Sequence, residues 1–192
     1  MAEATPWAAR LPAFVLVTGN DDKRREAERI LGRPVEAVSV ELPEIQSLDL
    51  GAVLREKAEE AWRRVGRPLV VEETGLELSG LNGFPGPLVK WMLEAIGPAG
   101  VARVAIASGD ARGRACCAMI YRDERGAVLG EGADRGRLVV PPRGDRGFGW
   151  DPVFEPEESA HTYGELPIEV KDARGHRGRA WRDLAARLAS ER

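Results

Sequence analysis

Residues 14–23 have the sequence FVLVTGNDDK, which joins an apolar run to a polar turn. The large apolar residues at its start are typical of a buried β-strand, and the polar residues after them are typical of a turn. Ala27, Ile30 and Leu31 then lie on one face of a helix that this spacing predicts over residues 22–31. A strand that leads into a helix through a short turn predicts the first unit of an α/β fold.

The same alternation of segments continues along the rest of the chain. Beyond the first unit, the patterns predict strands at 35–40 and 68–71, helices at 50–65, 88–96 and 98–107, antiparallel strands within 113–140 with glycine turns at Gly126 and Gly136, and a last helix at about 176–190. This order of elements predicts an α/β fold with a mixed sheet.

Length and composition indicate an ordinary globular domain. The chain has 192 residues, of which 43% are hydrophobic and 31% are charged. A net charge of -3 offers no electrostatic reason to expect a nucleic acid as partner. No apolar run approaches the roughly 18 residues of a membrane span. We therefore expect a cytoplasmic protein with a loose N-terminal tail at residues 1–12 and one domain at 13–192.

The two cysteines, Cys116 and Cys117, are adjacent in an apolar stretch that predicts a strand. Neighbouring residues of a strand point to opposite faces, so a disulfide between them would be strained. A metal site would require further ligands nearby, and the sequence suggests none. We interpret both cysteines as small residues of the hydrophobic core.

Lysine is scarce in this chain, because only four of its 28 cationic residues are lysine. One of them, Lys23, ends the turn that begins with Thr18, Gly19 and Asn20. A hydroxyl, a glycine, an amide and a helix N-terminus next to a lysine favour an oxyanion such as phosphate. The alternatives are that the lysine has no special role and that the two aspartates of this turn simply cap the helix.

Acidic residues follow two of the predicted strands. Glu72 and Glu73 end the apolar strand at 68–71, and Glu44 lies in an earlier loop. Adjacent strand residues face opposite ways, so we expect at most one of the pair to share a cleft with Glu44. Carboxylates beside a phosphate site fit Mg²⁺, and a free carboxylate can accept a proton from an attacking water. The alternative is a solvated acidic loop.

A third candidate segment is Phe148-Gly149-Trp150-Asp151-Pro152. Two aromatic rings beside an acid can stack on a planar base and form hydrogen bonds with it. Hydrogen-bond donors follow at Lys171, His176 and Arg177. The alternative is an aromatic pair in the core beside a glycine turn.

Taken together and in this order, the segments resemble the inosine triphosphate pyrophosphatase family. The match covers about residues 13–187. It consists of Thr18-Gly19-Asn20 with Lys23, Leu42-Pro43-Glu44, Lys57, Glu72-Glu73-Thr74-Gly75-Leu76, Leu81-Asn82-Gly83 with Pro85-Gly86-Pro87, Phe148-Gly149-Trp150-Asp151-Pro152, Lys171 and His176-Arg177. Each motif alone is weakly specific, whereas all of them in register are strongly specific.

The resemblance implies a two-lobed α/β fold, usually homodimeric, with the nucleotide in a cleft between the lobes. It implies that water attacks the α-phosphorus of ITP, dITP or XTP with Mg²⁺, which gives the monophosphate and pyrophosphate. It makes Glu73 and Lys23 catalytic and Glu44 and Glu73 ligands of the metal. It assigns substrate binding to Thr18, Gly19, Asn20, Lys23, Lys57, Thr74, Phe148, Gly149, Trp150, Asp151, Lys171, His176 and Arg177.

Hypoxanthine and xanthine carry an acceptor at position 6, where adenine carries an amino group. Donors from His176 and Arg177 are therefore expected to select 6-oxopurines.

Three motifs depart from the family's pattern. Glu73 replaces an aspartate, Val170-Lys171-Asp172 replaces a Glu-Lys-Asn run, and Gly175-His176-Arg177 replaces Ser-His-Arg. One extra methylene moves a carboxylate by about 1 Å, which is enough to change a rate. The departures leave two alternatives to a 6-oxopurine triphosphatase. One is a specialised relative that acts on a modified nucleotide in a biosynthetic pathway, and the other is a nucleotide-binding module with weakened catalysis.

Overall fold

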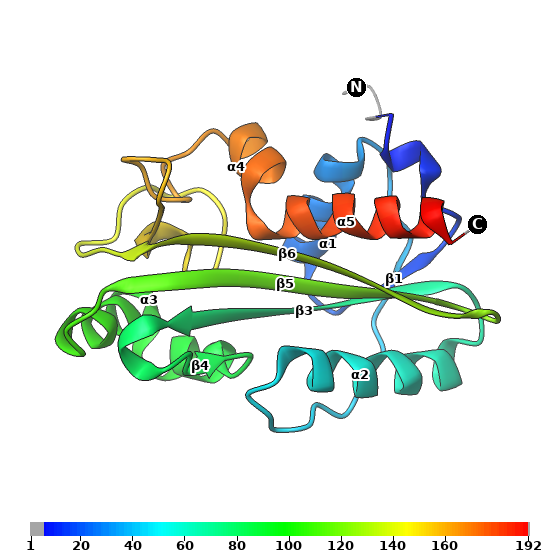
Figure 1. Cartoon of the computed structure of the whole chain (residues 1–192), viewed down its shortest axis with the longest axis horizontal. Helices are drawn as coiled ribbons and strands as arrows, with labels where there is room; N and C mark the ends of the chain where they lie inside the picture. The colour runs from blue at the N-terminus through cyan, green and yellow to red at the C-terminus, as the bar shows by residue number, and fades with distance from the viewer. Residues whose placement is uncertain (1–5, 192) are drawn as a thin grey trace.

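A computed structural model describes residues 6–191 of the chain. Figure 1 shows a long, twisted β-sheet with helices above and below it. Within the described residues the sheet has seven strands, in the order β2-β1-β3-β5-β6-β7, with β4 paired to the C-terminal end of β3. β1 is parallel to both of its neighbours, and the other pairs are antiparallel. The predicted mixed α/β sheet is confirmed.

The elements have the following bounds. The strands are β1 Val15–Val17, β2 Ala37–Val38, β3 Leu69–Leu78, β4 Pro85–Gly86, β5 Arg112–Asp123, β6 Gly126–Leu138 and β7 Phe154–Pro156. The helices are α1 Asp21–Leu31, α2 Leu50–Val65, α3 Val89–Ala107, α4 Ile168–Arg174 and α5 His176–Ser190, with short 3₁₀ turns η1 Ala8–Arg10, η2 Ser79–Leu81 and η3 Asp151–Val153. The two helices predicted at 88–96 and 98–107 are the halves of α3, which breaks at Gly97.

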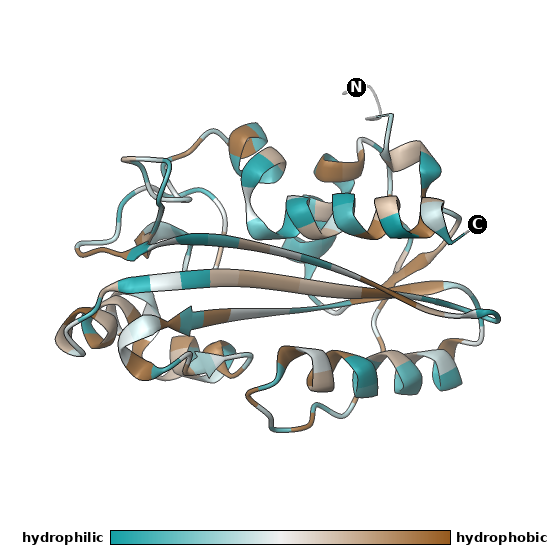
Figure 2. Cartoon of the chain, in the orientation of Figure 1, coloured by the Kyte–Doolittle hydropathy of each residue, from teal (hydrophilic) through white to brown (hydrophobic). Residues whose placement is uncertain are grey.

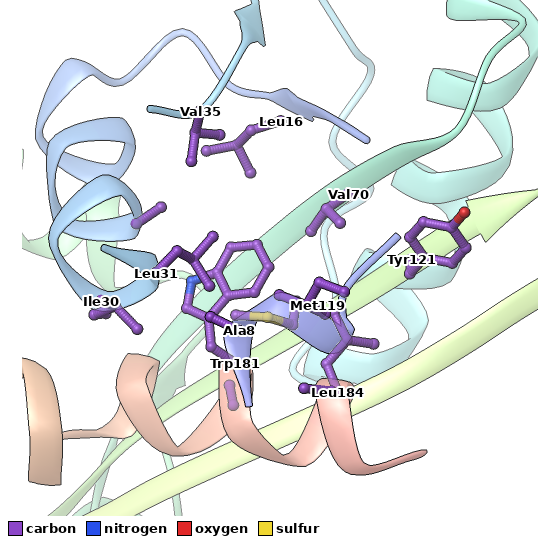
Figure 3. Close-up of a cluster of buried hydrophobic side chains, with 14 of the residues drawn as sticks. Ala8, Leu16, Ile30, Leu31, Val35, Val70, Met119, Tyr121, Trp181 and Leu184 are labelled. Carbon is purple, nitrogen blue, oxygen red and sulfur yellow. The ribbon is translucent and has the colours of Figure 1, made fainter. Parts of the chain in front are cut away.

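The central strands have a different hydrophobic core on each face. Val70 and Met119 belong to the cluster that includes α1 and α5, whereas Val71 and Ile120 pack against α2. In Figure 3, Trp181 of α5 lies among side chains of α1 and of the sheet. Figure 2 shows hydrophilic and hydrophobic residues mixed along α2 and α5, as expected for helices that cover a sheet.

A third cluster lies farther along the long strands and forms the second lobe. There, Leu76 and Ala115 of the sheet pack with Val101 of α3 and Phe154 of β7. The two lobes share β3, β5 and β6, so the sheet joins them. None of the helices within residues 6–191 is long and apolar enough to cross a lipid bilayer.

The segment around Ala8 and Leu11 packs against the rest of the protein. Ala8 and Leu11 are buried, with exposed fractions of 1% and 6%, and both belong to the cluster under α5. The prediction of a loose tail at residues 1–12 is therefore wrong for this segment, because two apolar side chains anchor it to the core (Figure 3 labels Ala8). Residues 1–5 lie outside the described residues.

The strand predicted at 68–71 continues to Leu78 and runs through the acidic motif. β3 pairs with β5 along its whole length, from Leu69 opposite Arg122 to Leu78 opposite Gly113. Glutamate and glycine have low intrinsic preference for strands, so pairing with β5 overrides the local signal. The catalytic candidate Glu73 therefore lies within a strand of the sheet and not in a loop.

The turn predicted at Gly136 is wrong, whereas a turn does precede Gly126 at the start of β6. Gly136 lies inside β6 opposite Gly113 of β5. A Cβ atom at this position would lie 2.3 Å from the carbonyl oxygen of Glu155. The glycine thus permits the close approach of β7 and does not form a turn. The short β7 and α4 had no prediction, because three- and seven-residue elements carry little periodicity.

Candidate active site

One cavity of about 680 Å³ gathers the predicted site. It lies at the C-terminal ends of β1 and β2, between the start of α3 on one side and the start of α5 on the other. Every residue that the sequence predicts for the site lines this cavity: Thr18, Gly19, Asn20, Lys23, Glu44, Lys57, Glu73, Thr74, Phe148, Gly149, Trp150, Asp151, Lys171, His176 and Arg177.

The turn between β1 and α1 is built by local hydrogen bonds. The side-chain oxygen of Asn20 accepts from the backbone N–H groups of Asp22 and Lys23, at 2.9 and 3.2 Å. Asn20 is thus the N-cap of α1, and the suggestion that the two aspartates cap the helix is wrong. The hydroxyl of Thr18 accepts from the N–H of Asn20 at 3.1 Å. These bonds hold the turn so that Lys23 faces the cavity.

Lys57 of α2 joins two of the predicted carboxylates. Its Nζ atom lies 3.1 Å from Oε1 of Glu44 and 2.6 Å from Oε2 of Glu73. Burial acts to lower the pKa of Lys57, but the two carboxylates hold it above its ordinary value. Burial acts to raise the pKa of Glu44, but Lys57 brings it below its ordinary value. Lys57 and Glu44 are therefore both charged at neutral pH.

The same two carboxylates are the candidate ligands for a divalent cation. Both already face one cationic nitrogen atom, so a single metal ion placed there can contact both. Among residues 6–191 no group of three or more His, Cys, Asp or Glu side chains is arranged to hold a metal unaided. Mg²⁺ commonly uses one or two carboxylates together with water and substrate phosphates. The donor set fits Mg²⁺ bound with a phosphorylated substrate.

Glu72 and Glu73 both line the cavity, so the prediction that only one of them shares it with Glu44 is wrong. The reason is a gap in the sheet. β1 pairs with β3 only as far as Val70, and β4 begins opposite Leu76. Residues 72–75 therefore have one free edge, and the cavity at this edge reaches side chains from both faces of β3.

Glu72 belongs to a buried network of charges. Nε of Arg177 lies 3.1 Å from Oε2 of Glu72, and NH1 of Arg177 lies 2.6 Å from Oε2 of Glu26. Nζ of Lys23 lies 3.3 Å from Oε1 of Glu72. Burial acts to raise the pKa of Glu72, but Arg177 and Lys23 hold it below its ordinary value. Glu72 therefore connects Lys23, after the turn between β1 and α1, to Arg177 at the start of α5.

Asp151 and Lys171 form the opposite wall. Nζ of Lys171 lies 2.7 Å from Oδ2 of Asp151, which also accepts from the N–H of Phe148 at 2.8 Å. The ring of Phe148 has Lys171 Nζ at 5.3 Å and Arg177 Cζ at 5.5 Å from its centre. Both Asp151 and Lys171 are almost fully buried. Internal pairs thus occupy Lys171 and Arg177, and their direct contact with a base stays a prediction.

His176 and Trp150 present polar atoms that lack a partner. Among the described residues, His176 Nδ1 and Trp150 Nε1 are buried without a hydrogen bond. Their rings lie 5.9 Å apart, and both line the cavity. Burial, then the charges of Arg177 and Lys171, place the pKa of His176 well below its ordinary value, so the imidazole is neutral. Buried polar atoms without partners in a cavity wall indicate contact with a ligand.

Trp150 is also part of the core. It is 7% exposed and belongs to the cluster around α3, so the alternative interpretation of this residue as a core aromatic holds together with its place in the cavity wall.

Two of the three departures from the family's pattern lie behind the cavity wall. Asp172 and Gly175 are not among the residues that line it. Oδ2 of Asp172 accepts from Nε of Arg29 at 2.7 Å, which joins α4 to α1. A Cβ atom at Gly175 would lie 2.8 Å from the carbonyl oxygen of Lys171. Only the third departure, Glu73, faces the cavity directly.

Sequence reasoning missed Glu26 and the start of α3. Glu26 is 2% exposed and contacts both Arg177 and Lys171. Glu26 lies four residues before Ile30 and therefore on the apolar face of the predicted helix. An acidic residue on such a face is rarely buried without a partner, and this was the signal available in the sequence. Leu88 and Trp91 also line the cavity and had no distinguishing pattern.

Comparison with known proteins identifies the family to which this fold belongs. Residues 14–187 match the model of the Ham1 family. Inosine triphosphate pyrophosphatase 2 of Trypanosoma cruzi is 43% identical over 169 residues, with 86% of each chain covered. Inosine triphosphate pyrophosphatase of Puccinia graminis f. sp. tritici is 36% identical over 178 residues, which cover 87% of this chain and 92% of the relative.

Solved structures agree with this placement. A HAM1 protein from Coxiella burnetii superposes with a TM-score of 0.76 at 25% identity, over 92% of this chain and 98% of the other. A nucleoside-triphosphatase (dITP/XTP pyrophosphatase) from Mycobacterium abscessus superposes with a TM-score of 0.64 at 28% identity, over 83% and 92%. The resemblance to inosine triphosphate pyrophosphatases is confirmed, and the chain belongs to the Ham1 family.

Proposed function

We propose that this chain hydrolyses 6-oxopurine nucleoside triphosphates, namely ITP, dITP and XTP, to the nucleoside monophosphate and pyrophosphate. The relatives that share 36–43% of its sequence are inosine triphosphate pyrophosphatases, which supports this activity. The observation that carries the proposal is the composition of one cavity. Lys57 with Glu44 and Glu73 lies at one end, and Phe148, Trp150 and a neutral His176, next to the buried pair of Lys171 and Asp151, lie at the other.

The chemistry follows from the groups at the first end. We propose that a water molecule attacks the α-phosphorus and that pyrophosphate leaves. Glu73, whose Oε2 lies 2.6 Å from Lys57 Nζ in the ligand-free protein, accepts the proton of the attacking water. Lys23 and Lys57 offset the negative charge of the phosphates. Mg²⁺ held by Glu44 and Glu73 supplies polarisation of the phosphate oxygens.

Selection of the base is assigned to the other end. A neutral imidazole has one N–H donor and one acceptor nitrogen. We propose that the N–H of His176 donates to the 6-oxo group of the base while Trp150 and Phe148 hold its ring. Adenine presents an amino group at this position, which leaves two donors facing each other. The departures at Asp172 and Gly175 lie behind the wall, so they offer little reason for a different base.

A homodimer in the cytoplasm is part of the same proposal. Trp91, Ile96 and Ile106 of α3 are exposed apolar side chains, with exposed fractions of 57%, 43% and 43%. Exposed apolar side chains such as Ile96 and Ile106, which lie outside the cavity, support contact with another protein surface. Cys116 and Cys117 are free and buried, which suits a reducing compartment. Light scattering of the purified protein tests the dimer directly.

The activity is tested with a panel of ITP, XTP, dITP, GTP and ATP in the presence of Mg²⁺. We expect pyrophosphate release, with kcat/KM for ITP about 10²-fold or more above that for ATP. Hydrolysis in ¹⁸O-labelled water should place the label in IMP, whereas label in pyrophosphate contradicts attack at the α-phosphorus. Turnover of ITP and XTP no faster than of every other nucleotide removes the proposal. Binding without turnover supports a binding module instead.

A further inference from the structure

The ammonium of Lys57 lies where a bound cation is needed. It contacts Glu44 at 3.1 Å and Glu73 at 2.6 Å, and its side chain is 13% exposed. Among residues 6–191, no other lysine or arginine forms an ion pair with either carboxylate. The single positive charge of Lys57 therefore already offsets part of the negative charge of the two proposed metal ligands.

We propose that Lys57 is an internal counter-ion that fills the cation site of the nucleotide-free enzyme and leaves it when metal and triphosphate bind together. The inference rests on the proposed function, because it takes Glu44 and Glu73 as the ligands of the divalent cation. It adds a role for Lys57 that differs from that of a fixed phosphate ligand. In this role the lysine exchanges one set of anionic partners for another.

The other lysines of the cavity have different neighbours, which makes Lys57 distinct. Lys23 pairs with Glu72 at 3.3 Å. Lys90 lies over the ring of Trp91, with Nζ 5.0 Å from the ring centre. A lysine side chain has four rotatable carbons and a compact charge, so it can turn from carboxylates to phosphate oxygens without movement of the helix. In the proposed function the triphosphate of the substrate binds in this same cavity, which Lys57 lines.

Two consequences follow from this arrangement. First, a metal ion alone has to displace an ammonium that is tethered to the protein, so it binds weakly. Second, the triphosphate offers new anionic partners to Lys57 and thereby frees Glu44 and Glu73. Metal and phosphate must then strengthen each other's binding by the same factor, because coupling between two ligands is reciprocal. The enzyme is thus protected from filling its cation site before substrate arrives.

The first experiment measures binding of Mn²⁺ by electron paramagnetic resonance, without nucleotide. Mn²⁺ prefers the same oxygen ligands as Mg²⁺. We expect Lys57→Met to bind Mn²⁺ on the order of tenfold more tightly than the unmodified protein, a typical size for coupling between sites. Lys90→Met is the matched control, because it removes the same charge from the same cavity, and its affinity should change less than about twofold. Equal or weaker binding by Lys57→Met overturns the proposal.

The second experiment uses only the unmodified protein, so it does not depend on how the variants fold. Thermal melting is followed with Mn²⁺ alone, with pyrophosphate alone and with both. We expect both together to raise Tm by more than the two separate shifts combined. Additive shifts overturn the proposal. Neither experiment measures turnover, so a protein that fails to hydrolyse ITP still tests the role of Lys57, and hydrolysis of ITP does not by itself support it.

Discussion

The two ends of the cavity hold their charges in different ways. At the phosphate end, the side chains of Glu44, Lys57 and Glu73 are 46%, 13% and 14% exposed. At the base end, Lys171, Asp151 and Arg177 are only 2–4% exposed. The first set contacts solvent and can exchange partners, whereas the second set is bonded inside the protein.

This difference matches the tasks proposed for the two ends. Groups that act on phosphate have to release protein partners and contact metal, water and substrate in turn. A wall that selects a flat base works best when it is rigid before the base arrives, because less order is then lost on binding. Substitutions at the phosphate end should therefore change rates, and substitutions at the base end should change stability or affinity.

The largest expected effect is at the phosphate end. Glu73→Gln removes the proposed proton acceptor and one metal ligand, so kcat for ITP should fall by about 10²–10⁴-fold. The matched control is Glu77→Gln, which lies on the same strand, pairs with Arg114 at 3.0 Å and is outside the cavity. Steady-state kinetics of both variants checks this. Equal losses in the two variants contradict a catalytic role of Glu73.

The next largest effect is expected from removing a buried charge at the base end. Arg177→Met leaves Glu26 and Glu72 buried without their guanidinium, which should lower the free energy of unfolding by about 3–5 kcal/mol. Arg25→Met is the control, because its pair with Asp22 is exposed and screened by solvent, so its loss should change the free energy of unfolding far less. Urea unfolding measures both. A loss at Arg177 as small as that at Arg25 argues that the buried network does not stabilise the fold.

The dependence of the free energy of unfolding on pH tests the same buried network of charges. The pKa of Glu72 is lower in the folded protein than its ordinary value, because Arg177 and Lys23 outweigh the effect of burial. Its contribution to stability is thus fully present above the ordinary pKa of a glutamate and is lost as pH falls through the folded pKa. Glu72→Gln should therefore destabilise the protein more at pH 7 than at pH 3.5. Urea unfolding at both pH values checks this, and an equal difference at both contradicts it.

The smallest effect concerns the indole nitrogen of Trp150. Trp150→Phe keeps an aromatic ring and removes a nitrogen that has no partner within the described protein. Loss of one hydrogen bond to substrate, about 1 kcal/mol, should raise KM for ITP about fivefold with little change in kcat. Trp181 has the same unpartnered nitrogen in a different core cluster, so Trp181→Phe should leave KM unchanged. An unchanged KM in both indicates that Trp150 acts only in packing.

Much of the site was predictable because its residues mark local structure. The turn after β1 follows from Asn20 and Lys23 at the start of a helix, and α2 follows from its apolar spacing and Gly66. Glu26 was not predicted as a site residue, since its partner Arg177 lies 151 positions away in the sequence. The extension of β3 was missed for a similar reason, because its pairing with β5 is long-range.

The sequence by itself determined the order of the longer strands and helices and the residue types available to the site. Those features depend on periodicity and on turn chemistry, which act over a few neighbouring residues. Only the tertiary structure decided that Lys57 lies between Glu44 and Glu73 and that Arg177 is enclosed by Glu26 and Glu72. The reason is that partner choice among charged side chains depends on distance and burial, and both arise only when distant segments pack together.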